Sequence, residues 1–436
     1  MPTLRPRISR RRFLAASASA CAISIVPRHV LGGPGRTLPS DVVTHGVIGL
    51  NVGLAFYVAP NEEGRPPVTL AVCDVHQDLV KRGLEKAGRG CTGYSDFRRM
   101  LDRPDIDVIK IATPPHWHAL MTILAAKAGK DIYCEKPMTR FIREGQAVIR
   151  AVRGYGRVCQ HNTYGRGGVW WAKLHKLVSS GLLGSPLTVH LGPQSGYDWH
   201  KGDNYGMKTY TPQPVPPELD YEMWLGPAPW KPFHPNRLLG GAWRPYWDYS
   251  SGGGLSDMGQ HWFDPIQYIL GKDGTGPEQI EALAPWPPHN DVVSPWRAVT
   301  YRYADGTTVV FESDDWGERL PGERPFIKGP KGKVFVPKGD WRLAVTDPPG
   351  LLDAVEDVPA PSRLVTFDEA VRTRIDGPGA RPNVEEAHRS VTVIHLGNIA
   401  IRLGRKLRWD PVKEEFPGDD EANRLVDIPM RAPWSL

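Results

Sequence analysis

The stretch Asp131-Ile132-Tyr133-Cys134-Glu135-Lys136-Pro137 combines a short apolar, strand-like run with a lysine placed directly before a proline. Proline fixes its own φ and confines the preceding residue to extended geometry, so the backbone at Lys136 is predicted to be stiff and its ammonium group well aimed. Alternating strand and helix patterns precede this stretch, and an aromatic-rich sequence follows it. We therefore expect Lys136 to lie between two domains, where cofactor and substrate clefts usually form. An ordinary surface lysine in a turn is the alternative.

The first 36 residues have the pattern of a targeting segment rather than of a folded domain. Ser9-Arg10-Arg11-Arg12-Phe13-Leu14 leads into a weakly apolar run that ends at Pro27 and is too short for an ordinary membrane-spanning helix. Paired arginines followed by Phe-Leu match a twin-arginine export signal. We expect residues 1–36 to be a signal and linker recognised by the twin-arginine export machinery, which predicts a periplasmic or otherwise extracytoplasmic protein. A basic, disordered tail is the alternative.

The charge of the chain depends largely on this segment. The formal net charge of the whole chain is +6, but residues 1–36 contain seven arginines and no acidic residue, which leaves 47 basic and 48 acidic residues in the remainder. Nothing in that balance favours a nucleic-acid partner. No other stretch approaches membrane-spanning length, so no stable membrane insertion is expected. The remaining 400 residues exceed one ordinary domain and predict two.

The four cysteines beyond the signal are scattered in or beside apolar stretches. Their spacing matches no metal site, so we expect buried thiols and no bound metal. These residues are Cys73, Cys91, Cys134 and Cys159.

Residues 40–162 show the alternation of short strands and helices that is typical of a dinucleotide-binding (Rossmann) domain with a doubly wound parallel sheet. The first strand runs into Gly49-Leu50-Asn51-Val52-Gly53, a variant of the glycine fingerprint in which Asn51 takes the middle position. Asparagine tolerates left-handed geometry, so we expect the turn to persist. Asp74 ends the next strand, where a carboxylate binds the adenosine ribose and repels the 2′-phosphate of NADP. This favours NAD as cofactor; a capping aspartate is the alternative.

The second domain, residues 163–436, contains the other candidate catalytic residues. Asp257 and His261 are four residues apart and share one face if the segment is helical, and an aspartate beside a histidine fixes its tautomer and stabilises its protonated form. Pro265 predicts a kink, or a new helix that begins near Asp264. A capping aspartate and a core histidine are the alternative.

Residues 193–250 are rich in Pro, Gly, Trp and Tyr and show little regular periodicity. Such long stretches usually build functional loops, and aromatic faces stack well on sugar rings. Ordinary packing of bulky side chains is the alternative.

These motifs together resemble the glucose-fructose oxidoreductase / inositol dehydrogenase / rhizopine catabolism (Gfo/Idh/MocA) family, over essentially the whole chain beyond the signal. The resemblance rests on the altered glycine loop, on Asp74, on Thr113-Pro114-Pro115-x-x-His118, on Cys134-Glu135-Lys136-Pro137 and on Gly252-Gly253-x-Leu255-x-Asp257-x-Gly259-x-His261. It implies a Rossmann domain followed by a substrate and oligomerisation domain of the α+β class, with an open, largely antiparallel sheet. A homo-oligomer is also expected.

The resemblance and the patterns above define three sets of candidate site residues. The catalytic set is Lys136, Asp257 and His261. The cofactor-binding set is Gly49, Asn51, Gly53, Asp74, Thr113, Pro114, His118, Glu135 and Lys136. The substrate-binding set is Tyr164, Arg166, Trp243 and His261.

The function expected from these residues is an exported, NAD-dependent oxidoreductase that transfers a hydride between a sugar or polyol hydroxyl and the nicotinamide. Free NAD is not expected outside the cytoplasm, so the cofactor would be tightly bound and regenerated within the site. Redox-neutral cleavage of a glycoside through a transient keto sugar is one alternative. A sugar- or nucleotide-binding protein without catalytic activity is the other.

Overall fold

The computed structural model describes residues 42–63, 65, 68–163, 166, 168–192, 210–238, 241–250, 252–284, 290–293, 296–313, 322, 325–337, 340, 343–356, 365–374 and 382–436. The predicted signal and Tyr164 lie outside the described residues. The chain divides into a small unit, Met1–Val42 with Glu62–Pro66, and a large unit, Val43–Asn61 with Pro67–Leu436. The fold described below is that of the large unit.

The first sheet consists of six parallel strands in the order β3-β2-β1-β4-β5-β6. This is the Rossmann order, in which the connections reverse direction next to β1 and open a ligand crevice at the carboxyl ends of the strands. It confirms the predicted doubly wound parallel sheet. The strands are β1 His45–Ile48, β2 Thr69–Cys73, β3 Thr92–Tyr94, β4 Val108–Ile111, β5 Asp131–Glu135 and β6 Cys159–Asn162.

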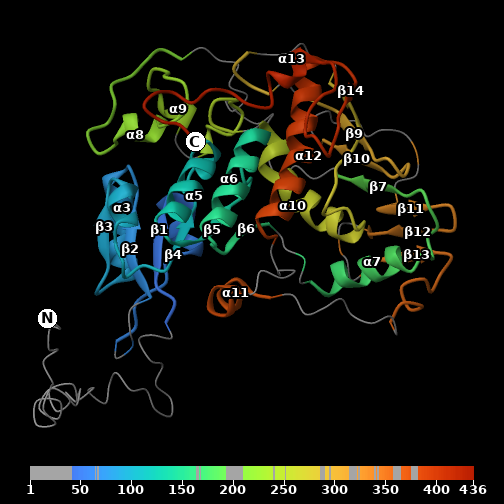
Figure 1. The fold of residues 1–436 in the computed structure, drawn as a ribbon, viewed down its shortest axis with the longest axis horizontal. Coiled ribbons are helices and arrows are strands. Elements are labelled where there is room, and N and C mark those ends of the chain that lie inside the picture. The colour runs from blue at the N-terminus through green and yellow to red at the C-terminus, as the bar shows by residue number, and fades with distance from the viewer. Residues whose placement is uncertain are drawn as a thin grey trace, which may run out of the picture. The chain divides into compact units, whose positions relative to one another are not determined.

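Helices cover this sheet on both faces, and the central strands β1 and β2 are buried along their whole length (Figure 1). On one face, buried Val47, Leu50, Val72 and Ala87 form a cluster with the helices that follow β1 and β2. The other face is covered by the helices that follow β4 and β5. The helices are α2 Leu50–Phe56, α3 Gln77–Ala87, α4 Phe97–Leu101, the 3₁₀ turn η2 Pro115–Trp117, α5 His118–Lys127 and α6 Ile142–Gly154.

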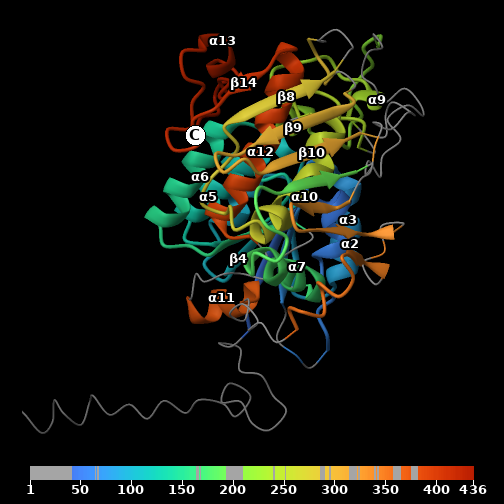
Figure 2. The ribbon, with the colours of Figure 1, turned by 90° about the vertical axis from the view of Figure 1, so that its right-hand side faces the viewer.

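The second sheet has eight strands in the order β13-β12-β11-β7-β10-β9-β8-β14. Every neighbouring pair is antiparallel except β7 with β10, which confirms the largely antiparallel sheet of the predicted α+β domain. Figure 2 shows its central strands side by side. The strands are β7 Thr188–Leu191, β8 Gln279–Leu283, β9 Ala298–Arg302, β10 Thr308–Glu312, β11 Ile327–Gly329, β12 Gly332–Phe335, β13 Val345–Asp347 and β14 Leu407–Arg408.

Two long helices connect the sheets. Helix α12, Val384–Leu403, contacts α6 and β6 of the Rossmann domain as well as β8 and β9, and α10, Gly253–Ile269, packs along it (Figure 1). Asn383 caps the start of α12 and Gly404, in left-handed geometry, ends it. Because α12 is buried along nearly its whole length, it fixes α10 relative to the first sheet.

Helix α10 runs without interruption through Pro265, so the prediction of a new helix near Asp264 is wrong. Proline removes one helical hydrogen bond, but the residues on either side, Phe263 and Ile266, are buried in the shared core. Their packing keeps the helix continuous across the proline.

The remaining helices are short. Of the predicted aromatic segment 193–250, residues 193–209, 239 and 240 lie outside the described residues, and the described part contributes an apolar cluster around Tyr221, Leu225, Phe233 and Tyr249. These helices are α7 Val169–Ser179, α8 Tyr221–Leu225, α9 Pro235–Leu238, α11 Phe367–Thr373 and α13 Asp420–Asn423.

Three of the four cysteines match the expectation of buried thiols. Cys73, Cys134 and Cys159 are buried free thiols, whereas Cys91 is only half-buried. No helix there has the length and apolar character needed to cross a bilayer.

Candidate functional site

A cavity of about 350 Å³ lies at the carboxyl ends of β1, β2 and β4. Residues that directly follow these strands line it, which is the place where a Rossmann sheet binds its ligand. The predicted site residues that line the cavity are Gly49, Asn51, Asp74, Thr113, Pro114 and Trp243. Its described lining includes none of Gly53, His118, Glu135, Lys136, Asp257 and His261.

The two glycines of the fingerprint allow close approach of backbone segments. Gly49 has a φ of +86°, and a Cβ added there would come within 2.6 Å of the backbone of Ala112 after β4. Gly53 brings α2 onto the sheet, because a Cβ there would lie 3.1 Å from Val47. Asn51 lies inside α2, so its tolerance of left-handed geometry is not used. The positive φ of the turn falls on Gly49 instead.

The carboxylate of Asp74 is held at the first turn of α2. Its oxygens accept hydrogen bonds from the backbone amides of Leu50, at 2.7 Å, and His76, at 2.9 Å. Burial raises the pKa of Asp74, and these amide donors oppose the shift. The side chain therefore reaches the cavity beside the residues that follow β2, as predicted for a ribose-binding carboxylate.

Large side chains of the second domain form part of the cavity wall. Met223, Trp224 and Trp243 line it. The carbonyl oxygen of Trp224 accepts hydrogen bonds from the indole of Trp117, at 3.1 Å, and from the imidazole of His116, at 2.9 Å. The segment around Trp224 is therefore bound to η2 at the cavity, which a sequence pattern could not reveal.

His118 connects the cavity wall to the Lys136 segment. The imidazole is fully buried, with Nε2 2.7 Å from the carbonyl oxygen of Thr113 and Nδ1 2.7 Å from that of Pro137. Burial lowers the pKa of His118, and its contacts with these carbonyls oppose that shift. His118 thus contacts the backbone of two segments that contain predicted cofactor-binding residues. Its own role as a cofactor ligand stays a prediction.

Lys136 and Asp257 are in direct contact. Lys136 Nζ donates to the backbone carbonyl of Asp257 at 2.6 Å and lies 3.2 Å from its Oδ1. Arg244 Nε donates to the same Oδ1 at 3.1 Å. Burial alone would raise the pKa of Asp257, but the charges and hydrogen bonds of Lys136 and Arg244 lower it below its usual value.

The second oxygen of this carboxylate has no such partner. Asp257 Oδ2 is buried, and no hydrogen-bond donor reaches it from the residues that the structure describes. His261 follows one turn later on the same face of α10 and is partly exposed. A buried carboxylate oxygen that lacks a donor is a natural acceptor for a ligand hydroxyl or for the neighbouring imidazole.

Glu135 lies within a small polar network behind Lys136. Its Oε1 accepts hydrogen bonds from the Tyr57 hydroxyl and from Asn162 Nδ2, and its Oε2 accepts one from the backbone amide of Lys136 at 3.2 Å. Asn162 also donates to the Tyr57 oxygen at 2.8 Å. Glu135 therefore anchors the backbone from which Lys136 projects.

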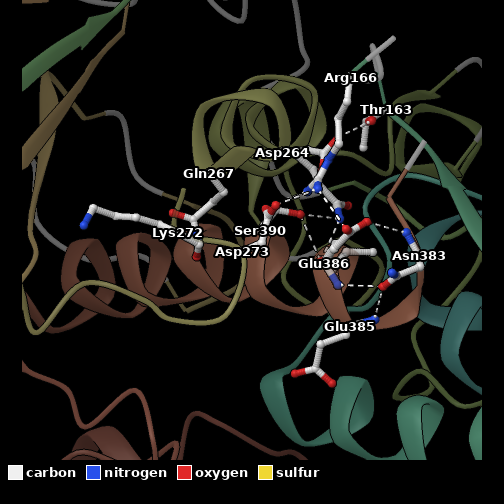
Figure 3. A network of polar contacts seen from close by, with 12 residues as sticks. Thr163, Arg166, Asp264, Gln267, Lys272, Asp273, Asn383, Glu385, Glu386 and Ser390 are labelled. Carbon is white, nitrogen blue, oxygen red and sulfur yellow. Dashed lines mark hydrogen bonds and ion pairs between the residues drawn. The ribbon is translucent and has the colours of Figure 1, made fainter. Parts of the chain in front are cut away.

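Arg166 does not fulfil the substrate-binding prediction. Its guanidinium is 2% exposed and is held between Asp264, Asp273 and Glu386, at 2.6 to 3.1 Å (Figure 3). Thr163 donates to the other oxygen of Asp264. A guanidinium whose donors are directed at three carboxylates has no donor for a sugar, so we assign Arg166 to the packing of α10 and α12. Tyr164 lies outside the described residues.

The sequence did not predict two residues that lie near the site, Arg244 and Tyr57. Arg244 follows the predicted Trp243 but belongs to no motif with Asp257. Tyr57 stands where α2 ends, and nothing local links it to Glu135. Trp243 and Arg244 are adjacent, so one segment reaches both the cavity and the Lys136–Asp257 contact.

Comparison with known proteins gives two matches to family models. Residues 43–163 match the model described as the oxidoreductase family, NAD-binding Rossmann fold (GFO_IDH_MocA). Residues 168–436 match that of the oxidoreductase family, C-terminal alpha/beta domain (GFO_IDH_MocA_C2).

Curated relatives match over limited lengths. A levoglucosan dehydrogenase of Pseudarthrobacter phenanthrenivorans is 40% identical over 87 residues, which is 20% of this chain and 22% of the relative. A myo-inositol 2-dehydrogenase of Thermotoga maritima is 22% identical over 214 residues, 47% of this chain and 48% of the relative. These alignments span less than half of the relatives' own lengths.

Solved structures share the fold at low identity. The WlbA dehydrogenase of Bordetella pertussis, in complex with NADH and UDP-GlcNAcA, is 16% identical with a TM-score of 0.55, over 85% of this chain and 99% of that chain. The aldose-aldose oxidoreductase of Caulobacter crescentus is 19% identical with a TM-score of 0.52, over 84% and 99%.

Proposed function

Because the chain belongs to the Gfo/Idh/MocA oxidoreductase family, we propose that it transfers a hydride between a sugar or polyol hydroxyl and a tightly held NAD. The observation that supports this most is the contact between Lys136 and Asp257. It joins the residue that follows a Rossmann strand to the second turn of α10, and Arg244, whose neighbour Trp243 lines the cavity, contacts the same carboxylate. Relatives named as sugar and inositol dehydrogenases support the substrate class.

The residues at the cavity fit a dinucleotide. A Cβ at Gly49 would fill the approach between β1 and β4, and the cavity volume lies within the roughly 300–1,000 Å³ typical of ligand sites. Asp74 would bind the ribose hydroxyls of NAD, and its negative charge disfavours the 2′-phosphate of NADP. Trp224 and Trp243 would cover the nucleotide from the second domain. That cover favours slow release of the cofactor.

The protein's own groups supply positioning and proton transfer. The bound nicotinamide would accept or return the hydride. Lys136 would donate a hydrogen bond to the reacting oxygen and stabilise its developing negative charge. His261 would take the hydroxyl proton, and Asp257 Oδ2 would orient His261 or bind an adjacent hydroxyl. Arg244 holds Asp257 ionised for this role.

The net reaction depends on how NAD is regenerated outside the cytoplasm. We propose that one sugar is oxidised and a second is reduced in the same site, so that no external NAD is consumed. A structural neighbour described as an aldose-aldose oxidoreductase is consistent with this reaction class. Redox-neutral glycoside cleavage would leave no oxidised sugar product and is thereby distinguishable.

One experiment tests these points together. Purified protein, without added NAD, is incubated with pairs of free sugars and separately with glycosides, and the products are identified. The proposal expects equal amounts of an oxidised and a reduced sugar, and NAD in the supernatant after denaturation. Release of an aglycone without net oxidation would replace it with glycoside cleavage. Recovery of NADP alone would refute the cofactor assignment.

Export is part of the same proposal and has its own test. The segment Ser9 to Leu14 is proposed to direct folded, cofactor-loaded protein through the twin-arginine route. Replacing Arg10 and Arg11 with lysine is expected to retain the precursor in the cytoplasm. Unchanged export of that double variant would remove the assignment.

A further inference from the structure

One segment of the second domain, residues 216–228, is attached to the cofactor cavity on both sides of β1, and we call it the strap. Leu219, Met223 and Trp224 of the strap line the cavity. Its first residues are hydrogen-bonded to the turn that follows β2, and its middle is hydrogen-bonded to η2, which follows β4. Strands β2 and β4 are the two neighbours of β1 in the sheet. The strap therefore connects two walls of the cavity.

The attachment after β2 is made by backbone groups alone. The amide of Gln77 donates to the carbonyl of Glu218, and the amide of Asp220 donates to the carbonyl of Val75, each at 2.9 Å. The two bonds form an isolated antiparallel bridge between the segments. The strap is thus joined to the backbone that directly follows Asp74, the predicted ribose ligand.

The attachment to η2 combines hydrogen bonds with close packing. The carbonyl of Trp224 accepts from the side chains of His116 and Trp117, as described above. Gly226, which ends α8 with a φ of +49°, lies directly on the indole of Trp117, and a Cβ added there would come within 2.0 Å of the ring. Trp117 is itself buried and lines the cavity. The backbone of the strap therefore covers a residue of the cavity wall.

Helix α8, the central part of the strap, is held by a residue from far along the chain. A helix of five residues is too short to be stable without outside contacts. The side chain of Arg431 places its Nε 3.0 Å from the carbonyl oxygens of both Gly226 and Ala228. Its NH2 donates to the carbonyl of Glu222 at 3.3 Å, and its NH1 pairs with the Glu222 carboxylate. An arginine at the end of a helix stabilises the last carbonyls in this way.

The residues next to Arg431 extend this contact to η2. The ring of Trp434 meets that of Trp117 edge-on, with the ring centres 4.9 Å apart, and the guanidinium of Arg98 lies 5.5 Å from the Trp434 ring centre. The amide of Trp434 donates to the carbonyl of Arg431 at 3.0 Å. Segment 431–434 therefore contacts the strap and η2 together.

We propose that Arg431 is a positioning residue that keeps the strap closed over the cavity and thereby slows release of the dinucleotide. This inference rests on the proposed function, because it takes the dinucleotide as the occupant of the cavity. The side-chain hydrogen bonds described for Arg431 all go to the strap, and Arg431 is not part of the described cavity lining. Its replacement would therefore loosen the strap without removing a nucleotide contact.

The rate of nucleotide release tests the proposal. Full-length protein is freed of nucleotide, loaded with NADH and mixed with excess NAD, and the loss of bound NADH is followed by its fluorescence. Arg431→Gln is expected to raise the release rate by about tenfold or more, because several hydrogen bonds from a charged donor are lost. Arg431→Lys, which keeps one charged donor, should give an intermediate rate. Arg424→Gln, at an exposed position, is the control and should match the wild type.

Hydrogen exchange of the nucleotide-free protein gives a readout that needs no cofactor. Peptides that cover the strap should exchange faster in Arg431→Gln than in the wild type, whereas peptides from β9 and β10 should be unchanged. If Arg431→Gln exchanges faster throughout the chain, Trp434→Leu, which removes the ring on Trp117, takes its place in both measurements.

The outcomes separate this inference from the proposed function. Faster release together with faster exchange confined to the strap would support the inference. Equal release rates in the wild type and the variant would overturn it, and tight binding of NAD would still stand. Failure of the wild type to bind NADH would instead refute the proposed function, and the inference with it.

Discussion

The Nζ atom of Lys136 lies 2.6 Å from the backbone carbonyl oxygen of Asp257 and 3.2 Å from its carboxylate. The two residues are 121 positions apart in the chain. Lys136 directly follows β5 of the first sheet, and Asp257 lies on α10. Both side chains are mostly buried, at 13% and 4% exposure, so solvent screens the pair only weakly. Breaking such a contact leaves a buried charge uncompensated, which makes each member sensitive to substitution.

Lys136→Met is expected to lower kcat by about 10²-fold or more, because the reacting oxygen loses its charged donor. NAD should remain bound, since Gly49 and Asp74 are untouched. Steady-state kinetics and nucleotide analysis after denaturation measure the two effects. Lys127→Met, an exposed position on α5, is the control and should be unchanged. Loss of NAD with unaltered turnover of the remaining holoenzyme would contradict the assigned role.

His261→Ala is expected to lower kcat by about 10²-fold, the scale of a positioned acid–base group. The residue lies on α10 and is not part of the described lining of the cofactor cavity, so bound NAD should be retained. The pH–rate profile should lose the inflection that belongs to this base. An unchanged profile in the variant would assign the proton transfer to another group.

Asp74→Asn tests cofactor choice. The amide can still accept one backbone hydrogen bond at this position, but the negative charge that opposes the 2′-phosphate is gone. The ratio of NADP to NAD affinity should rise by roughly tenfold or more, equivalent to about 1.4 kcal/mol. Calorimetric titration of protein freed of its nucleotide measures the ratio. If wild type and variant show the same ratio, Asp74 does not determine the choice.

The position of the cofactor cavity could be predicted from local sequence, because parallel strands place their carboxyl ends on one edge of the sheet. Gly49, Asp74 and Thr113 each end or follow a recognisable strand, and the topology then brings them around one cavity. Asp257 and His261 share a face through helical spacing alone. The contact of Asp257 with Lys136 follows from no local signal, because the two positions are 121 residues apart, and only the family resemblance brings them together in one predicted site.

Arg166 shows why the rest could not be predicted. Its partners Asp264, Asp273 and Glu386 follow it by 98 to 220 residues and converge only after α10 and α12 have packed. An arginine after a strand looks the same in sequence whether it binds a substrate or a buried carboxylate. The prediction of a new helix near Asp264 is wrong for a related reason, since the buried residues on both sides of Pro265 outweigh its local preference.

Tyr57→Phe is expected to lower kcat several-fold while KM stays near its wild-type value. The hydroxyl donates a hydrogen bond to Glu135, which in turn accepts one from the backbone amide of Lys136. Loss of the hydroxyl therefore makes the position of the lysine side chain less fixed without altering substrate contacts. Tyr133→Phe is a matched control, because the Tyr133 hydroxyl donates to Asn162 rather than to Glu135. Equal effects of the two changes would indicate a general loss of packing instead.

Glu386→Gln is expected to flatten the pH dependence of stability. Burial raises the pKa of Glu386 to about 7 from a reference of 4.5, and the acids Asp264 and Asp273 add to this while Arg166 opposes it. Between these pH values the folded state keeps a proton that the unfolded state has released. The wild type should therefore lose stability as the pH rises from about 4.5 to 7, and remain level above that.

The glutamine keeps the helix cap, since its side chain can still accept from the Asn383 amide, and it removes one of three negative charges around Arg166. Denaturant unfolding at pH 5 and pH 7.5 should show a smaller decrease in the variant, by about 1–3 kcal/mol. Glu385→Gln is the control, because Figure 3 shows that side chain directed away from Arg166. A slope that matches the wild type in Glu386→Gln would place the titrating group elsewhere. The half-buried Asp273, whose pKa is also raised by desolvation, would then be the next residue to replace.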